Sequence, residues 1–177
     1  IMFFFSCSDD ETPAISSNGG GASEVTFTDI DGNVYHEIKI GNQTWMKENL
    51  KTTRYRNGFD ITTNLSSVDW QSNITGACAD YNNDPPITIV YGKLYNWYAV
   101  ANPLGLCPVN WHVPSDSEWT ELANYLGGDS IAGGKLKEIG VSHWATPNTN
   151  ATNSSSFTGL PGGYRLPTGA YYNIYAV

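Results

Sequence analysis

Regular alternation of polar and apolar side chains between residues 25 and 48 places the strongest constraint on the fold of this chain. Every second side chain from Val34 to Ile40 falls on one face of an extended segment. Asp31-Gly32 precedes this segment and Gly41-Asn42 follows it. Both pairs suit tight turns, because Gly, Asn and Asp tolerate positive φ at little cost. The pattern therefore predicts that the domain opens with an antiparallel β-meander.

A second local pattern predicts a helix from Ser115 to Leu126. Ser115 and Glu118 form an S-x-x-E capping box, in which each side chain accepts a hydrogen bond from an otherwise unpaired backbone N–H. The apolar residues that follow share one helical face. Gly127-Gly128 provides a left-handed stop.

Two further helices are predicted with less regular patterns. Residues 131–139 form a short helix interrupted by Gly133-Gly134 and ended by Gly140. Residues 91–99 carry apolar side chains at helical spacing but are apolar nearly all round, so a buried helix is predicted and a buried strand is the alternative. Residues 141–156 are rich in Asn, Ser and Thr and predict a long polar loop. The expected fold class is α+β, with a β-meander, two to three short helices and long polar loops.

Charge excludes one broad class of partner. The chain has 9 Lys and Arg against 17 Asp and Glu, which gives a net charge of −8. Nine cations form no basic stripe, so binding to nucleic acid is not expected. Aromatic residues make up 13% of the chain, which is not the composition of a disordered protein.

The first residues predict where the protein is located in the cell. Phe4-Phe5-Ser6-Cys7 resembles a bacterial lipobox in which Cys7 is acylated, so residues 1–7 are interpreted as the remnant of a signal peptide. An ordinary apolar N-terminal strand is the alternative.

The acidic run that follows consists of Ser8, Asp9, Asp10 and Glu11. It resembles the export signal of Bacteroidetes surface lipoproteins, and residues 12–23 read as a flexible tether. Residues 8–23 therefore separate the anchor from a domain at 24–177. The expected location is the outer membrane, lipid-anchored at the cell surface.

Five motifs, in order along the chain, resemble one family of bacterial surface proteins. They are Gln43–Thr52, Tyr91–Trp97, Trp111–Trp119, Gly133–Lys137 and Gly159–Arg165. Together they resemble the Fibrobacter succinogenes major paralogous domain family. The resemblance implies a C-type lectin-like fold and no established activity. Members continue into closing strands that end near a V-R-C-like strand, whereas this chain stops at Val177, so the domain is expected to be incomplete at its C-terminus.

His112–Trp119 also resembles the R-L-P-T-x-x-E-W signature of formylglycine-generating enzymes. That activity needs a reactive cysteine pair late in the chain, and Cys107 is the last cysteine, so it is rejected. If Cys7 is acylated, Cys78 and Cys107 remain, and a disulfide between them is predicted. Two free buried thiols are the alternative.

Oxygen ligands at alternate positions suggest calcium as the one cofactor. Asp80, Asn82 and Asp84 begin like a calcium loop, but Pro85 and Tyr91 stand where an EF-hand needs Gly and Glu. A different calcium geometry is the hypothesis, and an Asx-rich turn is the alternative.

Aromatic residues outside the predicted core could stack on sugar rings. Trp70, Trp144 and Tyr164 are the candidates for this role, whereas Trp45, Trp97, Trp111 and Trp119 are expected in the core. The expected function is binding or adhesion through a glycan or protein ligand, without enzymatic activity. The alternatives are a polysaccharide hydrolase, which needs a close carboxylate pair, and a structural surface or filament component.

Overall fold

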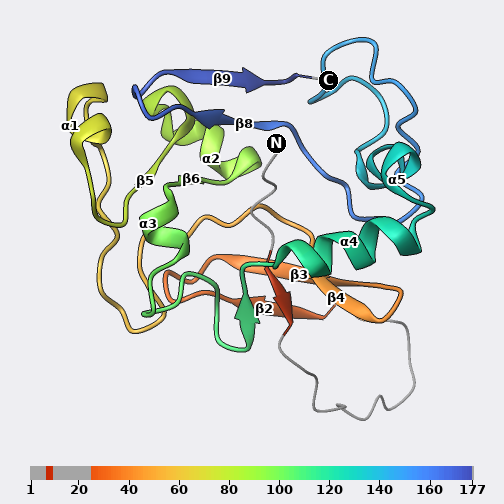
Figure 1. Cartoon of the computed structure of the whole chain (residues 1–177), viewed down its shortest axis with the longest axis horizontal. Helices are drawn as coiled ribbons and strands as arrows, with labels where there is room; N and C mark the ends of the chain where they lie inside the picture. Colours follow the sequence, from red (N-terminus) through yellow and green to blue (C-terminus); the bar gives the residue numbers. More distant parts are fainter. Residues whose placement is uncertain (1–6, 10–24, 177) are drawn as a thin grey trace.

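The computed structural model describes residues 7–9 and 25–176. Figure 1 shows a lower layer built on an antiparallel sheet and an upper layer built on a hairpin. The strands are β1 (Ser8–Asp9), β2 (Thr26–Thr28), β3 (Val34–Ile40), β4 (Gln43–Met46), β5 (Cys78–Ala79), β6 (Leu94–Tyr95), β7 (Trp111–His112), β8 (Gly162–Arg165) and β9 (Tyr171–Ile174). The helices are α1 (Ser67–Ser72), the 3-10 turn η1 (Tyr81–Asn83), α2 (Pro85–Tyr91), α3 (Trp97–Val100), α4 (Asp116–Tyr125) and α5 (Asp129–Leu136).

The predicted β-meander is confirmed. Strands β2, β3 and β4 pair antiparallel, with Ile38 opposite Trp45. The first turn is closed by Asp29, whose carboxylate accepts hydrogen bonds from the backbone N–H groups of Asp31 and Asn33. Gly32 sits at φ +83° within it, where a side chain would be strained. Turn chemistry accounts for the hairpin, but the alternation does not decide which face is buried, because Tyr35 is buried whereas Val34 on the expected apolar face is exposed.

Strand β1 is a feature that the sequence did not predict. Ser8 and Asp9, expected in the acidic export segment, form a strand between β4 and β7, so the sheet has the order β2-β3-β4-β1-β7. Ser8 is buried. The other expected export residues, Asp10 and Glu11, and the tether at 12–23 lie outside the described residues. The predicted separation of this segment from the domain is therefore wrong for residues 8 and 9.

The predicted disulfide between Cys78 and Cys107 is also wrong. Cys107 is bonded to Cys7, with Cα atoms 6.1 Å apart. Cys78 is a free, buried thiol in β5, opposite Tyr95 of β6. The reason is topological, because β1 runs beside β7 and so brings Cys7 to the loop that contains Cys107. A sulfur in a disulfide carries no thioether-linked lipid, so Cys7 is not in an acylated state in this structure.

Helix α4 follows its sequence signals closely. Ser115 is the N-cap and forms the complete capping box with Glu118. Helix α5 begins two residues before the predicted segment and ends at Leu136. The predicted helix over 91–99 is wrong for residues 92–96, because Gly92 at φ +70° ends α2 and the buried strand β6 follows, as the alternative had it. Residues 97–99 are helical and belong to α3. At Gly92 a Cβ would lie 2.5 Å from the Cβ of Asn49, so the position excludes larger residues.

Helix α4 lies along the sheet beside β3 and β4 (Figure 1). Leu122 of α4 and the C-cap residue Leu126 join Ile40 and Trp45 in one buried cluster. The ring of Trp119 packs against that of Trp45, with centroids 4.5 Å apart. This packing fixes the position of α4 relative to the turn between β3 and β4.

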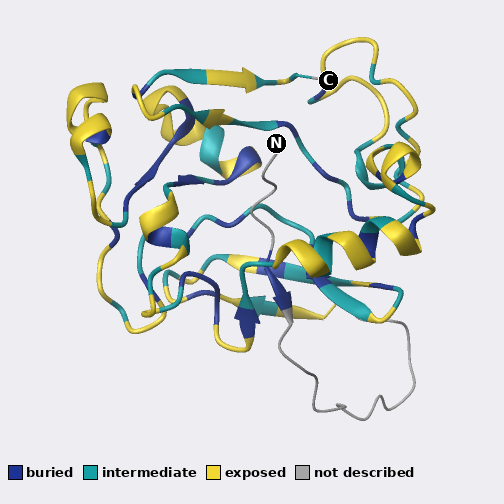
Figure 2. Cartoon of the chain, viewed as in Figure 1, coloured by how far each residue is buried: buried dark blue, intermediate teal, exposed yellow. Residues whose placement is uncertain are grey.

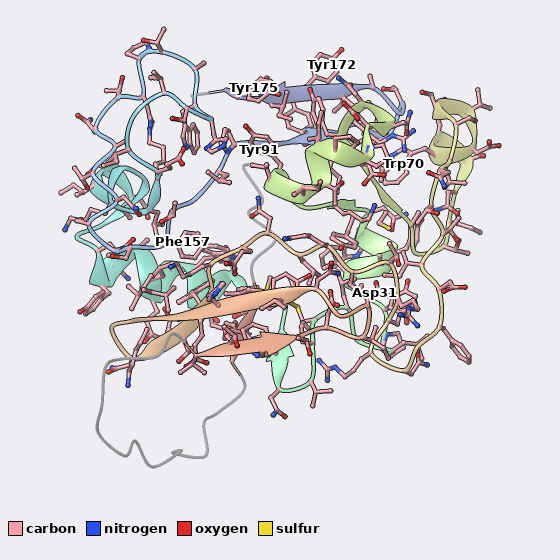
Figure 3. The ribbon with its side chains drawn as sticks, turned by 180° about the vertical axis from the view of Figure 1, so that it is seen from behind. Asp31, Trp70, Tyr91, Phe157, Tyr172 and Tyr175 are labelled. Atoms are coloured by element: carbon pink, nitrogen blue, oxygen red, sulfur yellow. A yellow bond between two sulfur atoms is a disulfide. The ribbon has the colours of Figure 1, made fainter. Side chains whose placement is uncertain are left out.

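The hairpin β8–β9 covers η1 and the short sheet β5–β6. Arg165 of β8 places its guanidinium over the rings of both Trp70 and Tyr171. The outer side of β9 is exposed in part (Figure 2). In Figure 3 Tyr172 and Tyr175 lie along this upper rim, whereas Asp31 lies near the loops at the opposite side.

The fold is mixed α and β with small antiparallel sheets, as the sequence predicts. In the part of the chain that the structure describes, every helix is too short or too polar to cross a membrane.

Candidate functional site

A groove between α4 and the β3–β4 turn is the candidate binding site. It encloses about 450 Å³, which falls in the range typical of small-molecule sites. Most of its lining residues have polar side chains, although carbon atoms contribute more of the exposed lining surface than polar atoms do; the lining residues are Ile40, Asn42, Gln43, Ser117, Thr120, Glu121, Asn124 and Tyr125.

One wall of the groove is the outer face of α4. Ser117, Thr120, Glu121 and Asn124 stand at i, i+3, i+4 and i+7, so their side chains share one face of the helix. The opposite face is buried through Leu122. Because the capping box and the buried face both fix α4, these polar groups are held at constant spacing.

The β3–β4 turn forms the other wall. Gly41, at φ +64°, lets this turn approach Tyr125, and a Cβ there would lie 2.9 Å from the aromatic ring. Gln43 donates a hydrogen bond from Nε2 to the carbonyl of Glu118 at 3.0 Å and so ties the turn to the helix. Tyr125 is nevertheless 65% exposed. Its ring is thus both positioned and accessible.

The chemistry of the groove suits a neutral ligand rich in hydroxyl groups. Asn42, Gln43 and Asn124 supply amide donors and acceptors, and Tyr125 supplies an aromatic surface. Glu121 is the one carboxylate among the lining residues, and none of them is a cation. Glycoside hydrolysis ordinarily uses two carboxylates, and this lining set supplies one.

Glu118, a carboxylate in the first turn of α4, has a structural role. Burial raises its pKa, but hydrogen bonds from the Ser115 side chain, the Ser115 backbone and His112 outweigh this and lower the pKa. Its Oε1 lies 2.7 Å from His112 Nε2 and 3.2 Å from Ser8 Oγ. Glu118 is therefore bound on several sides and joins α4 to strand β1.

Ser8, His112 and Glu118 have the residue types of a nucleophilic triad but not its geometry. Ser8 Oγ lies 2.9 Å from His112 Nε2, the same nitrogen that contacts Glu118. A triad uses opposite ring nitrogens for the nucleophile and the carboxylate. Ser8 is also buried. The cluster therefore holds the sheet to α4 and is not a site for nucleophilic attack on a substrate.

The predicted calcium ligands Asp80, Asn82 and Asp84 differ in their surroundings. Asp80 Oδ1 lies 2.5 Å from Lys93 Nζ, and both side chains are nearly buried. Burial raises the Asp80 pKa, but hydrogen bonds from Lys93 and Thr88 lower it overall. Asn82 and Asp84 are exposed. Among residues 7–9 and 25–176, no three His, Cys, Asp or Glu side chains group closely enough to hold a metal ion.

Two of the three predicted stacking residues are buried. Trp70 is covered by Arg165, and Trp144 donates a hydrogen bond from Nε1 to the Gly159 carbonyl within the interior. The prediction that they offer free ring faces is therefore wrong. Tyr164 is 41% exposed and stacks on Tyr172 across the hairpin, with centroids 6.0 Å apart.

Trp97 is exposed where burial is expected. It was expected in the core but is 73% exposed on α3, because α3 is a single turn whose buried residue is Ala99.

None of the predicted site residues lines the groove. The available signal was the polar face of α4 at i, i+3, i+4 and i+7, but most surface helices show such a face. Only the approach of the β3–β4 turn to α4, which the tertiary structure shows, distinguishes this polar face from that of an ordinary surface helix.

The family model of the Fibrobacter succinogenes major domain matches residues 38–177. No curated protein and no solved structure matches the chain.

Proposed function

The chain belongs to the Fibrobacter succinogenes major domain family, and we propose that its domain binds neutral glycans in the groove between α4 and the β3–β4 turn. The observation that carries this proposal is the combination of amide side chains with one positioned, exposed aromatic ring in a single groove. Sugar rings present hydroxyl groups at their edges and C–H groups on their faces. Amides match the hydroxyl groups, and the Tyr125 ring matches a face.

The proposal extends to a C-type lectin-like fold and to a place at the cell surface. The motif order of the sequence supports the fold assignment, and the lipobox-like segment supports anchoring through Cys7 in the outer membrane. Anchoring applies to chains in which Cys7 is not bonded to Cys107, since one sulfur cannot serve both purposes. Calcium, if it takes part through Asp80, has to displace Lys93 from that carboxylate.

Binding to immobilised oligosaccharides tests the proposal. The probes are neutral oligomers of glucose, mannose and N-acetylglucosamine, each with and without added Ca²⁺. We expect saturable binding without release of shorter sugars. Tyr125→Ala removes the aromatic surface and should weaken binding by roughly tenfold, since loss of an aromatic contact costs on the order of 0.5–1.5 kcal/mol beyond the area that it buries.

Two further tyrosine variants make the result specific. Tyr98→Ala removes another exposed ring, on α3, and should leave binding unchanged. Tyr164→Ala removes half of the exposed pair on the β8–β9 hairpin. If Tyr164→Ala abolishes binding and Tyr125→Ala does not, the site lies on the hairpin and the groove assignment is wrong. Turnover of an oligosaccharide would instead support the hydrolase alternative.

A further inference from the structure

A second, smaller pocket lies away from the groove, between the β2–β3 turn and the loop before β7. It encloses about 210 Å³, and Ile30, Arg54, Arg56 and Val109 are among its lining residues. That volume is below the range of about 300–1,000 Å³ usual for drug-sized ligands, so the pocket admits a small molecule or a single chemical group.

Arg56 is held in this pocket by neutral partners. Its Nε donates to the carbonyl of Cys107 at 3.1 Å, and its Nη2 donates to the carbonyl of Trp111 at 2.6 Å. Its backbone N–H donates to the carbonyl of Gly105 at 2.9 Å. Carbonyl groups orient a guanidinium without cancelling its charge. None of the ion pairs found among the described residues includes Arg56.

The other charged groups at the pocket already have hydrogen-bonding partners, although the neutral donors around Asp29, which also lines the pocket, leave its negative charge in place. Arg54 Nε lies 2.5 Å from Asp31 Oδ1. The Asp29 carboxylate is buried and accepts hydrogen bonds from the Asn33 side chain and the Tyr35 hydroxyl, besides two backbone N–H groups. Arg56 is therefore the cation of this pocket that has no acidic partner.

The guanidinium of Arg56 also has donors to spare. A guanidinium carries five N–H donors, and two of them are bound to the Cys107 and Trp111 carbonyls. A planar fork with free N–H groups matches the two oxygens of a carboxylate. The held orientation reduces the side-chain entropy that such a contact would otherwise cost.

Apolar side chains at the rim define the rest of the ligand. Val109 is 67% exposed and Ile30 is 44% exposed, and both line the pocket. They would contact carbon atoms next to the carboxylate, and they would not favour a strongly hydrated dianion such as phosphate. The net charge of −8 opposes anions at long range, but a Debye length of about 8 Å at physiological salt screens most of it.

We propose that this pocket binds a small organic carboxylate, with the carboxylate on Arg56 and its short alkyl part between Ile30 and Val109. The site is separate from the glycan groove, since the two share no lining residue.

Propionate is the probe, and propionamide is its uncharged counterpart of nearly the same shape. We expect propionate, titrated at constant ionic strength, to shift the backbone amide NMR signals of residues 54–56 and 105–109 saturably, and propionamide to shift none of them. Arg56→Gln should weaken binding by roughly tenfold or more, given the usual strength of hydrogen bonds between charged groups. Arg165→Gln, outside the pocket, should leave it unchanged.

A second pair of variants leaves Arg56 in place and alters Val109 instead. Because Val109 is exposed, we expect both variants to fold. Val109→Asp places a negative charge at the rim and should weaken propionate binding, whereas Val109→Asn, of the same size without the charge, should retain most of it. Equal shifts with propionate and propionamide, or equal propionate binding by Val109→Asp and Val109→Asn, would overturn the proposal. Unchanged binding by Arg56→Gln would do the same.

Discussion

Loss of the Cys7–Cys107 disulfide should destabilise the domain strongly. The bond closes a loop across a sequence separation of 100 residues. In the chain-entropy model a loop of about 100 residues restricts the unfolded chain by roughly 4.7 kcal/mol at 25 °C. Domains of this class unfold at about 5–15 kcal/mol, so Cys107→Ser removes a large fraction of the total. The contacts of Ser8 with His112 and Glu118 add to the loss if β1 then leaves the sheet.

Urea denaturation of the oxidised wild type and of Cys107→Ser measures the difference. The free energy of unfolding should fall by about 3–5 kcal/mol. With an unfolding entropy of about 2.1 cal/mol/K per residue, the Tm should fall by roughly 8–13 °C. The dependence on urea should also become steeper, because an unfolded chain without the cross-link exposes more surface.

Cys78→Ala is the matched control. Cys78 is buried and takes no part in the disulfide, and burial raises its thiol pKa to about 12. Dithiothreitol should therefore destabilise Cys78→Ala as much as wild type and leave Cys107→Ser unchanged. Peptide mapping that links Cys78 to Cys107, or a stability difference under about 1 kcal/mol, would refute the reasoning. Isolation of a chain lipidated on Cys7 should coincide with a free Cys107 thiol.

Other substitutions test the remaining structure. Asp80→Asn leaves Lys93 charged and nearly buried, which should lower the free energy of unfolding in urea by about 3–5 kcal/mol. The double variant with Lys93→Met should recover part of this loss. An Asp80→Asn variant as stable as wild type would contradict the buried pair. Ser115→Ala should lower the free energy of unfolding by about 1 kcal/mol through loss of the N-cap. A melting curve identical to that of wild type would contradict this role of Ser115. Leu122→Ala should cost about 2–5 kcal/mol because the side chain is fully buried, with an unchanged Tm counting against the α4 packing. The folded-state pKa of Glu118 lies below its ordinary value of 4.5, so its stabilising effect is full above pH 4.5 and declines as the pH falls through the folded-state pKa. The free energies of unfolding of wild type and Glu118→Gln, measured against pH, should therefore converge at acid pH. Parallel curves would exclude Glu118 as the group responsible.

Local sequence patterns determined the elements whose signals are short in range. The alternation of β3 and the turns on either side of it depend on neighbouring residues, and so does the capping box at Ser115 and Glu118. The same kind of reasoning failed for residues 92–96, because apolar spacing alone could not distinguish a helix from a buried strand, and Gly92 lay near the predicted start of the helix.

Only the tertiary structure decided the contacts between residues far apart in the chain. Three cysteines allow three pairings, and the choice of Cys7 with Cys107 depends on β1 lying beside β7. The groove depends on Gly41 and Tyr125 meeting across more than eighty residues. Trp70 and Trp144 look like free aromatic residues in sequence, yet Arg165 and Lys137 cover their rings. Such contacts follow from the packing of the whole chain, because burial depends on which surfaces meet and no local pattern records that.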